Sequence, residues 1–347
     1  MSDILGRKGR HIDAVLSGRV SARDTRTGFE RVRFVHCALP ELDLDAIDLS
    51  TQFLGHRLSA PLMVSAMTGG PERAGAINAA LAEAAQAHGI ALAVGSQRIS
   101  LTAGASSGLD ASLRRRAPTI PIFANIGAVQ LVAGFGVDHA RRAVDALQAD
   151  ALVLHLNPLQ EALQARGDTR WSGVARGIEA VCAALPVPVI AKEVGFGISA
   201  AVARRLADAG VQAIDVAGAG GTSWAAVEGA LADDREAAGM AELFRDWGIP
   251  TADALVDVRR ALPGMPLIGS GGIRDGLDVA KAIRLGADVV GQAAALLPAA
   301  IAGAAAVGAH LQALHDALRL ACFATGAGSI AALRRVALQH GDVDAEA

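Results

Sequence analysis

The sequence contains no tyrosine, and aromatic side chains make up only 3% of its 347 residues. Proteins that bind single-stranded nucleic acid stack the bases on aromatic rings, so this scarcity argues against such a surface. The 32 basic and 35 acidic residues give a formal net charge of -3, and no overall positive field would attract a polyanion. We therefore expect no nucleic-acid partner, and any anionic ligand must be held by a local cluster of donors.

Cysteine is equally scarce. Cys37, Cys182 and Cys322 are odd in number and show neither CxxC nor zinc-finger spacing. This pattern predicts ordinary buried thiols and excludes a disulfide framework or a structural zinc site.

Long hydrophobic runs are also missing. The Ala-rich stretch 296–307 is interrupted by Gly303 and is shorter than the roughly 20 apolar residues that span a bilayer. The first 15 residues carry charges throughout, unlike a secretory signal. We expect a soluble, cytoplasmic protein with no membrane partner.

Short apolar runs recur after the polar residues 1–60, and a helix-like Ala/Leu segment follows each of them. Most are nearly continuous in apolar residues, as strands are when both faces of a parallel sheet are buried. Their spacing fits repeated units of a strand and a crossover helix. We expect strands within Pro61–Met67, Ile90–Ser96, Pro121–Gly127, Ala151–Asn157, Pro188–Val194, Ala213–Gly218, Pro266–Gly272 and Val289–Ala293.

Eight such units favour an α/β fold of the closed (β/α)8 TIM-barrel type. An open doubly wound sheet is the alternative. The barrel is preferred because polar residues cluster after nearly every strand, as an active site at the C-terminal face requires. We expect residues 1–60 to form an N-terminal extension that packs on the barrel and closes over the substrate, and residues 61–347 to form the barrel, with an insertion after the sixth strand at 220–265.

The ends of the first two strands carry small and polar residues. The small residues from Ser65 to Gly70 would let the backbone approach a flat ring system, although a plain glycine turn is the alternative. Ser96 and Arg98 follow the second strand. A guanidinium suits a phosphate because its fork donates bidentate bonds, and a surface salt bridge is the competing interpretation.

The fourth strand ends in the sequence HLNPLQE, residues 155–161. Alternation points His155 and Asn157 to the same side, and we expect Gln160 and Glu161 in the loop that follows. These residues offer donors to an anion and one carboxylate to Mg²⁺, which commonly takes one or two carboxylates, waters and phosphate oxygens. A barrel histidine with satisfied hydrogen bonds and a solvated Glu161 would be the structural alternative.

Lys192 and Glu193 interrupt the apolar fifth strand. Charges there are costly to bury unless they are paired or bound to a ligand. A buried ammonium would stabilise negative charge on a bound ring, whereas a structural Lys–Glu pair is the alternative.

The seventh and eighth strands lead into glycine-rich turns at 269–274 and 291–294. Barrels frequently bind phosphate with the loops after these two strands. By contrast, the glycines at 218–221 do not complete a GxGxxG fingerprint, and a Rossmann site gains little support.

Together these motifs resemble the type 2 isopentenyl diphosphate isomerase family, from residue 7 to beyond residue 294. The combination of HLNPLQE, KEVG and SAMTGG is specific, whereas SGGIR-type loops occur in many FMN barrels. Two places depart from the family pattern: residues 164–168 and the stretch after Val227. The motifs that carry the resemblance are RKxxHI, ALPEL, SAMTGG, GSQR, HLNPLQE, KEVGFGIS, DVAGAGGTSW, DWGIPT and SGGIRDGLDVAKA.

The resemblance implies an enzyme that interconverts isopentenyl and dimethylallyl diphosphate with reduced FMN and Mg²⁺, with NADPH as the reductant, in a homo-oligomer (tetramer or octamer). Catalysis would involve Gln160, His155 and Lys192, and Glu161 would hold the metal. The substrate would meet Arg7, Lys8, Arg98, His155, Asn157 and Gln160. FMN would meet Ser65, Ala66, Met67, Thr68, Ser96, Asn125, Lys192, Thr222, Gly271, Gly272, Ala293 and Ala294.

The implied reaction exchanges a proton at C2 for one at C4 without net oxidation. Because Gln160 is too weak a base, the resemblance assigns the proton transfer to reduced flavin, with its N1 ionised beside Lys192. One alternative is an FMN-dependent 2-hydroxy acid or dihydroorotate-type oxidoreductase, for which the expected His/Arg pair is missing after the seventh strand. The other is a non-catalytic barrel that binds FMN or phosphate.

Overall fold

The computed structural model describes residues 2–67, 72–103 and 108–339. Its centre is a closed barrel of parallel strands in the order β10-β3-β4-β5-β6-β7-β8-β9, which confirms the (β/α)8 prediction. Each strand lies within the run predicted for it: β3 Leu62–Val64, β4 Ala91–Ala93, β5 Ile122–Gly127, β6 Ala151–His155, β7 Val189–Lys192, β8 Ala213–Asp215, β9 Leu267–Gly269 and β10 Val289–Gln292.

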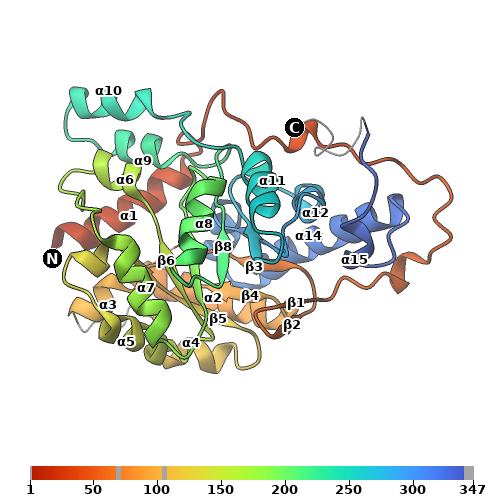
Figure 1. The fold of residues 1–347 in the computed structure, drawn as a ribbon, viewed down its shortest axis with the longest axis horizontal. Coiled ribbons are helices and arrows are strands. Elements are labelled where there is room, and N and C mark those ends of the chain that lie inside the picture. The colour runs from red at the N-terminus through yellow and green to blue at the C-terminus, as the bar shows by residue number, and fades with distance from the viewer. Residues whose placement is uncertain (1, 68–71, 104–107, 340–347) are drawn as a thin grey trace.

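Helices surround the strands (Figure 1). Several begin at a side chain that accepts a backbone N–H, such as Ser199 for α8 and Asp275 for α12, which satisfies the free donors of the first turn. The helices of the barrel are α2 Glu72–His88, α3 Arg98–Ala103, α4 Ala111–Arg116, α5 Val137–Leu147, α6 Pro158–Leu163, α7 Val174–Ala184, α8 Ala200–Asp208, α9 Trp224–Ala230, α10 Arg235–Leu243, α11 Thr251–Ala261, α12 Gly276–Arg284, α13 Leu297–Ala302, α14 Ala304–Ala324 and α15 Ile330–Leu333.

Four short 3₁₀ helices complete the described elements. They are η1 Phe29–Arg31, η2 Leu44–Ala46, η3 Ala128–Val132 and η4 Ala294–Leu296.

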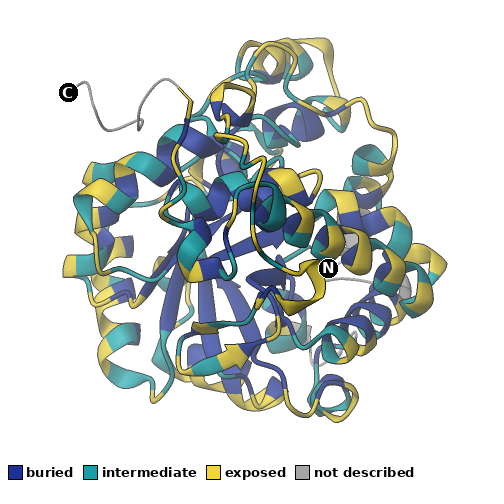
Figure 2. Cartoon of the chain, turned by 90° about the vertical axis from the view of Figure 1, so that its right-hand side faces the viewer, coloured by how far each residue is buried: buried dark blue, intermediate teal, exposed yellow. Residues whose placement is uncertain are grey.

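The core has two layers, one on each side of the barrel strands, and Figure 2 shows these strands in the colour of buried residues. The larger layer fills the space between strands and helices, and the smaller one fills the barrel itself. A hairpin of the extension, β1 Thr51–Phe53 and β2 His56–Leu58, contributes Phe53 and Leu58 to the inner layer. The Phe53 ring lies 6.3 Å from the Phe123 ring, centroid to centroid. The hairpin therefore closes one end of the barrel.

The rest of the extension reaches the opposite end. Helix α1 Ser2–Leu16 packs against α9, and Figure 1 shows both far from the β1–β2 hairpin. Backbone bonds join the next segment to the loop after β8, from Ala22 N to Gly221 O (3.0 Å) and from Ser223 N to Val20 O (2.8 Å). Helices α9 and α10 lie between β8 and α11 in the chain.

None of the helices in the described residues is long and apolar enough to cross a membrane.

Candidate functional site

A cavity of about 510 Å³ opens at the carboxyl ends of the barrel strands. Every predicted site residue whose side chain the structure describes lines it. Arg7 and Lys8 belong to α1, but their side chains lie outside what the structure describes, as does Thr68 altogether. The predicted residues that line the cavity are Ser65, Ala66, Met67, Ser96, Arg98, Asn125, His155, Asn157, Gln160, Glu161, Lys192, Thr222, Gly271, Gly272, Ala293 and Ala294.

Lys192 is buried in the wall of this cavity, 8% exposed. Its Nζ donates to the backbone oxygen of Glu193 at 2.6 Å and lies 3.7 Å from Asp215 Oδ2. The ammonium is therefore paired with Asp215, the residue that lies beside Lys192 on the neighbouring strand β8. The structural Lys–Glu pair suggested by the sequence is not formed between the two side chains.

The Glu193 carboxylate turns instead to the loop after β7. Its Oε2 accepts the backbone N–H groups of Val194, Gly195 and Phe196 at 2.6, 2.7 and 2.6 Å. Burial raises the pKa of Glu193 to about 7, although these three donors and Lys192 act against the shift. Burial also raises the pKa of Asp215, opposed chiefly by Lys192 and by the hydroxyl of Ser270.

His155 faces the cavity from the end of β6. Its Nδ1 lies 2.8 Å from Asn125 Oδ1 on β5; with the amide oxygen as acceptor, Nδ1 carries the proton. The backbone N–H of Asn125 in turn donates to Gln97 Oε1 at 3.0 Å. Neighbouring strands therefore hold the imidazole ring in one orientation.

Asn157, Gln160 and Glu161 form a buried network with a residue from α9. Asn157 Nδ2 donates to Gln160 Oε1 at 3.1 Å and to Glu161 Oε1 at 3.2 Å, and Gln160 Nε2 donates to Glu228 Oε1 at 3.0 Å. The expected loop placement of Gln160 and Glu161 was wrong. Both lie on α6, because Asn157 stands at the helix N-cap and Pro158 suits the first helical turn.

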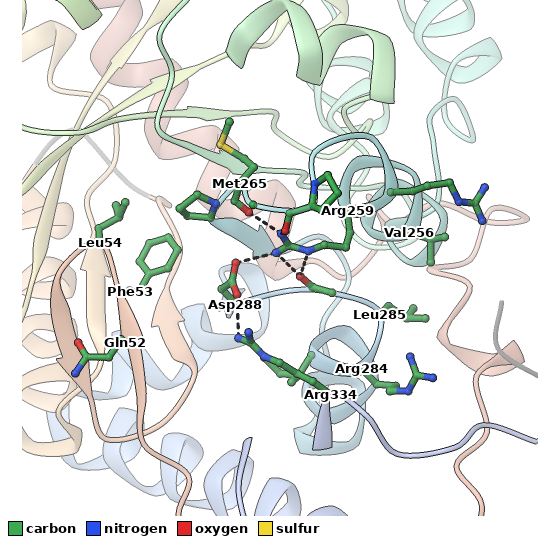
Figure 3. A pocket seen from close by; sticks show the side chains of 16 residues that line it. Gln52, Phe53, Leu54, Val256, Arg259, Met265, Arg284, Leu285, Asp288 and Arg334 are labelled. Atoms are coloured by element: carbon green, nitrogen blue, oxygen red, sulfur yellow. Dashed lines mark hydrogen bonds and ion pairs between the residues drawn. The ribbon is translucent and has the colours of Figure 1, made fainter. Parts of the chain in front are cut away.

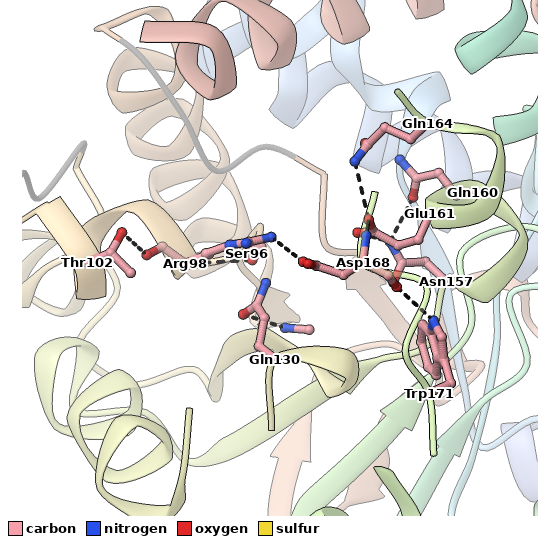
Figure 4. Close-up of polar contacts among 11 residues, drawn as sticks. Ser96, Arg98, Thr102, Gln130, Asn157, Gln160, Glu161, Gln164, Asp168 and Trp171 are labelled. Carbon is pink, nitrogen blue, oxygen red and sulfur yellow. Dashed lines mark hydrogen bonds and ion pairs between the residues drawn. The ribbon is translucent and has the colours of Figure 1, made fainter. Parts of the chain in front are cut away.

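Glu161 is 8% exposed and is not a solvated glutamate. Its Oε2 accepts the backbone N–H of Asp168 at 2.7 Å and Gln164 Nε2 at 3.2 Å. Asp168 also forms an ion pair with Arg98, in which Asp168 Oδ2 lies 2.8 Å from Arg98 Nη1. Figure 4 shows this chain of contacts crossing from the loop after α6 to α3. Arg98 thus has a carboxylate partner beside the cavity.

The loops after β8 and β9 pack backbone against backbone. A Cβ added to Gly271 would lie 2.2 Å from Gly218 O, and one added to Gly221 would lie 2.6 Å from Gly272 Cα. Gly271 and Gly272 also adopt φ values of 102° and 68°, where glycine avoids the strain of other residues. Gln292 Nε2 braces the same loop by donating to Ile273 O at 3.1 Å. This stretch of the cavity is a narrow cradle of backbone groups.

The cavity fits the FMN suggested by the resemblance. Its volume lies in the range of cofactor sites, and Ser65, Ala66, Ala293 and Ala294 leave room for a ring system against the strand ends. Within the described ranges the buried Ser65 Oγ has no hydrogen-bond partner, which suits a ligand group as its partner. The cradle after β9 and the turn after β10 offer backbone donors to a phosphate.

The donor set for Mg²⁺ is smaller. In the part of the chain that the structure describes, no group of three or more His, Cys, Asp or Glu residues could hold a metal ion. Glu161 supplies one carboxylate, and the buried Asn157 Oδ1 has no hydrogen-bond partner among the described residues. One carboxylate and amide oxygens fit a Mg²⁺ ion whose other ligands are waters and phosphate oxygens.

The residues near the site that were not predicted from the sequence include His11, Asp215, Glu228 and Ser270. Glu228 is 5% exposed on α9, and His11 Nε2 from α1 lies 3.2 Å from its Oε1. The Trp224 indole stands edge-on to the His11 ring, with centroids 5.3 Å apart. The carboxylate in an apolar stretch at 224–230 was the available signal for Glu228, because a buried acid needs a partner.

A second cavity of about 820 Å³ lies at the other end of the barrel, beside the β1–β2 hairpin (Figure 3). Its Arg259 donates to the backbone oxygens of Pro263, Met265 and Gly286 and to Asp288 Oδ2. Arg334 Nη2 contacts the same carboxylate at 2.9 Å. These contacts tie loops together, and none of the predicted site residues lies there.

Comparisons with known proteins agree on the family. The family model described as FMN-dependent dehydrogenase matches residues 8–106 and 137–340. A protein of Xanthobacter autotrophicus named isopentenyl-diphosphate delta-isomerase is 63% identical over 332 residues, 96% of each chain. A protein of the same name from Stutzerimonas stutzeri is 60% identical over 335 residues, 96% of this chain and 97% of the relative.

Solved structures share the fold. Mandelate oxidase with (S)-2-phenylpropionate superposes with a TM-score of 0.67 at 22% identity, over 97% of this chain and 98% of that one. At this identity the likeness shows the fold alone, whereas the two named relatives are 63% and 60% identical along nearly their whole length. The chain therefore belongs to the type 2 isopentenyl-diphosphate delta-isomerase family, built on the FMN-dependent dehydrogenase barrel.

Proposed function

We propose that the protein interconverts isopentenyl and dimethylallyl diphosphate with reduced FMN bound in the barrel mouth. The names of its relatives support the substrate pair. The single observation that carries the proposal is that one cavity brings together Lys192, the glycine cradle and the buried network of Asn157, Gln160 and Glu161. We assign Lys192 and the cradle to the cofactor and call them the first wall, and we assign the network to the substrate and call it the second, or network, wall.

On the first wall, small residues would contact the flavin ring and backbone donors would bind its phosphate. Lys192 would face the polar edge of the ring, where its charge stabilises an ionised N1. Ser65 would complete its hydrogen bonding with the cofactor, since its buried hydroxyl has no partner among the described residues. The other residues assigned to FMN are Ala66, Met67, Thr68, Ser96, Asn125, Thr222, Gly271, Gly272, Ala293 and Ala294.

On the second wall, polar groups would bind the diphosphate. Arg98, His155, Asn157 and Gln160 line the cavity, and Glu161 would hold a Mg²⁺ ion, which would neutralise negative charge on the diphosphate. Arg98 would exchange its contact with Asp168 for the ligand or share it. Arg7 and Lys8, on helix α1, would add two positive charges from the extension, which would close over the substrate.

Reduced FMN, when bound, would supply the acid–base group that exchanges a proton at C2 for one at C4. The chain's own residues would hold the allylic carbons against the ring, because orientation at near-contact distance is a large part of catalysis. The Gln160 amide donates to Glu228 and accepts from Asn157, so it is held as an orienting group and does not act as a base. Ile12, Val15 and Trp224 line the cavity as well and would keep water from the reacting carbons.

NADPH as the flavin reductant and a homo-oligomeric assembly complete the proposal. Both are implied by the family resemblance, and both are open to direct measurement, by anaerobic reduction kinetics and by light scattering.

The test combines a spectrum with a labelled assay. The purified protein, incubated with FMN, should show tight flavin binding; it is then photoreduced without oxygen and given isopentenyl diphosphate and Mg²⁺ in D₂O. We expect product in large excess over enzyme, deuterium at C4 and flavin that stays reduced. One reducing equivalent consumed per product would favour the oxidoreductase alternative, and bound flavin without any turnover would favour a non-catalytic barrel.

A further inference from the structure

Lys192 is a buried lysine, and burial of a charged group needs a compensating partner. The side chain is 8% exposed and ends in the wall of the cavity. Burial alone disfavours the charged form of lysine, by several pKa units in extreme cases. A lysine that stabilises negative charge on a ring therefore needs a nearby group that favours its protonated form.

Asp215 is placed to be that group. It is the ladder partner of Lys192 across β7 and β8, and its Oδ2 lies 3.7 Å from Lys192 Nζ. Asp215 is only 1% exposed, whereas Lys192 lines the cavity. The carboxylate thus stands behind the ammonium, where it can act on a ligand through Lys192 but has no access to it directly.

Ser270 fixes the orientation of this carboxylate. Its Oγ donates to Asp215 Oδ1 at 2.6 Å, and the backbone N–H of Ala217 donates to the same oxygen at 3.2 Å. Both donors use Oδ1, so the other oxygen, Oδ2, remains directed to the lysine. In the described part of the chain Oδ2 accepts no hydrogen bond. Lys192 Nζ, 3.7 Å away, is therefore the group with which this oxygen pairs.

Two other titratable groups face Lys192, and neither replaces Asp215. The Glu193 carboxylate is turned away to three backbone donors, although its backbone oxygen accepts from Nζ. His155 lies beside Lys192 on the other neighbouring strand, β6, and its side chain is hydrogen-bonded to Asn125. Burial raises the pKa of Asp215 while Lys192 opposes the shift. The charge of Lys192 therefore favours the ionised form of Asp215.

We propose that Asp215, oriented by Ser270, is a positioning residue that keeps the Lys192 ammonium charged and directed at the cofactor ring. The inference rests on the proposed function only for the identity of that ring. Removing the carboxylate takes away the opposite charge that favours the protonated form of Lys192. Where Lys192 loses its proton, the reduced ring would lose its stabilising charge.

The experiment measures the midpoint potential of bound FMN against pH, without substrate, in the FMN-loaded protein. Asp215→Asn should introduce a break at least about one pH unit below any break of the unmodified protein, with the potential falling more steeply above it. Ser270→Ala should shift the curve in the same direction by less. The double variant Asp215→Asn with Lys192→Met should lack the break. Asp288→Asn, the same change at the far end of the barrel, should leave the curve unchanged.

Three results would overturn the inference. A uniform rise of the potential in Asp215→Asn without a new break would mean that Asp215 acts only by its own charge. A break that persists in the double variant would belong to another group, such as His155 or Glu193. A Ser270→Ala curve identical to the unmodified protein would show that the serine orients nothing, and this variant decides the matter if Asp215→Asn does not fold. Because no substrate is present, the outcome is independent of whether the protein isomerises isopentenyl diphosphate.

Discussion

The two ends of the barrel differ in how their polar groups are paired, although Arg334 Nε at the closed end also lacks a hydrogen-bond partner among the described residues. At the end closed by the β1–β2 hairpin, Arg259 donates to three backbone oxygens and to Asp288. The apolar side chain of Phe53 packs inside the barrel at this end. At the mouth, buried atoms of Ser65 and Asn157 have no hydrogen-bond partner within the described residues. Unpaired buried polar atoms cost free energy unless a ligand completes them. The contacts at the closed end therefore stabilise the fold, whereas the unpaired polar atoms at the open end are available to bind ligands.

Phe53→Ala should give the largest effect at the closed end. Phe53 is 3% exposed inside the barrel, and deleting a buried phenylalanine typically costs about 3–5 kcal/mol. Denaturant unfolding should show this loss, while flavin affinity of the folded protein should hardly change. A large loss of FMN affinity without a loss of stability would break the division between the two ends.

Lys192→Met should act mainly on activity at the mouth. Removing a charge that stabilises a developing negative charge should slow isomerisation about 10²-fold to 10³-fold. Some stability should also be lost, because Asp215 is left buried without its partner. The matched control is Lys281→Met, which removes a lysine whose Nζ donates to Phe29 O away from the cavity. Equal losses of activity in both variants would contradict a specific role for Lys192.

Glu193→Gln, at the mouth, should change how the free energy of unfolding depends on pH. The folded-state pKa of Glu193 is raised to about 7 from 4.5, so between these values the folded state binds more protons and loses stability as pH rises. The variant lacks this dependence. Its unfolding free energy relative to the unmodified protein should rise by on the order of 1–3 kcal/mol between pH 5 and about 7.5. A difference that is flat with pH would mean that Glu193 is ionised throughout.

Glu161→Gln tests the metal. A neutral amide lacks the charge that attracts a divalent cation, so half-maximal activity should need at least about 10-fold more Mg²⁺, equivalent to roughly 1.4 kcal/mol. FMN binding should be retained, since Glu161 lies on the network wall. An unchanged Mg²⁺ titration would place the metal elsewhere.

Ser65→Ala should have the smallest effect. In the described structure without ligands the hydroxyl makes no hydrogen bond, so its removal should change stability by less than about 0.5 kcal/mol. FMN affinity should fall by up to about 10-fold, the value of one hydrogen bond. A clear loss of stability in the flavin-free protein would instead reveal a structural partner for Ser65.

Much of the fold could be predicted because its signals are local. Continuous apolar runs mark strands that are buried on both faces, and the polar residues that follow them mark the C-terminal face of the barrel. The strands are shorter than the predicted runs because residues such as Asn157 and Val194 leave the ladder to form the mouth. The helix that carries Gln160 and Glu161 was missed because Asn157 and Pro158 suit a turn as well as a helix start.

The sequence by itself determined which residue types stand at each strand end, and with them the barrel and the family, since periodicity and motifs are properties of neighbouring residues. Only the tertiary structure decided the partners. Lys192 pairs with Asp215, 23 positions away, in place of adjacent Glu193, because alternation sends neighbouring side chains to opposite faces of a strand and parallel pairing brings the next strand alongside. Glu228 likewise reaches Gln160 across 68 positions, a contact that exists only once the barrel has closed.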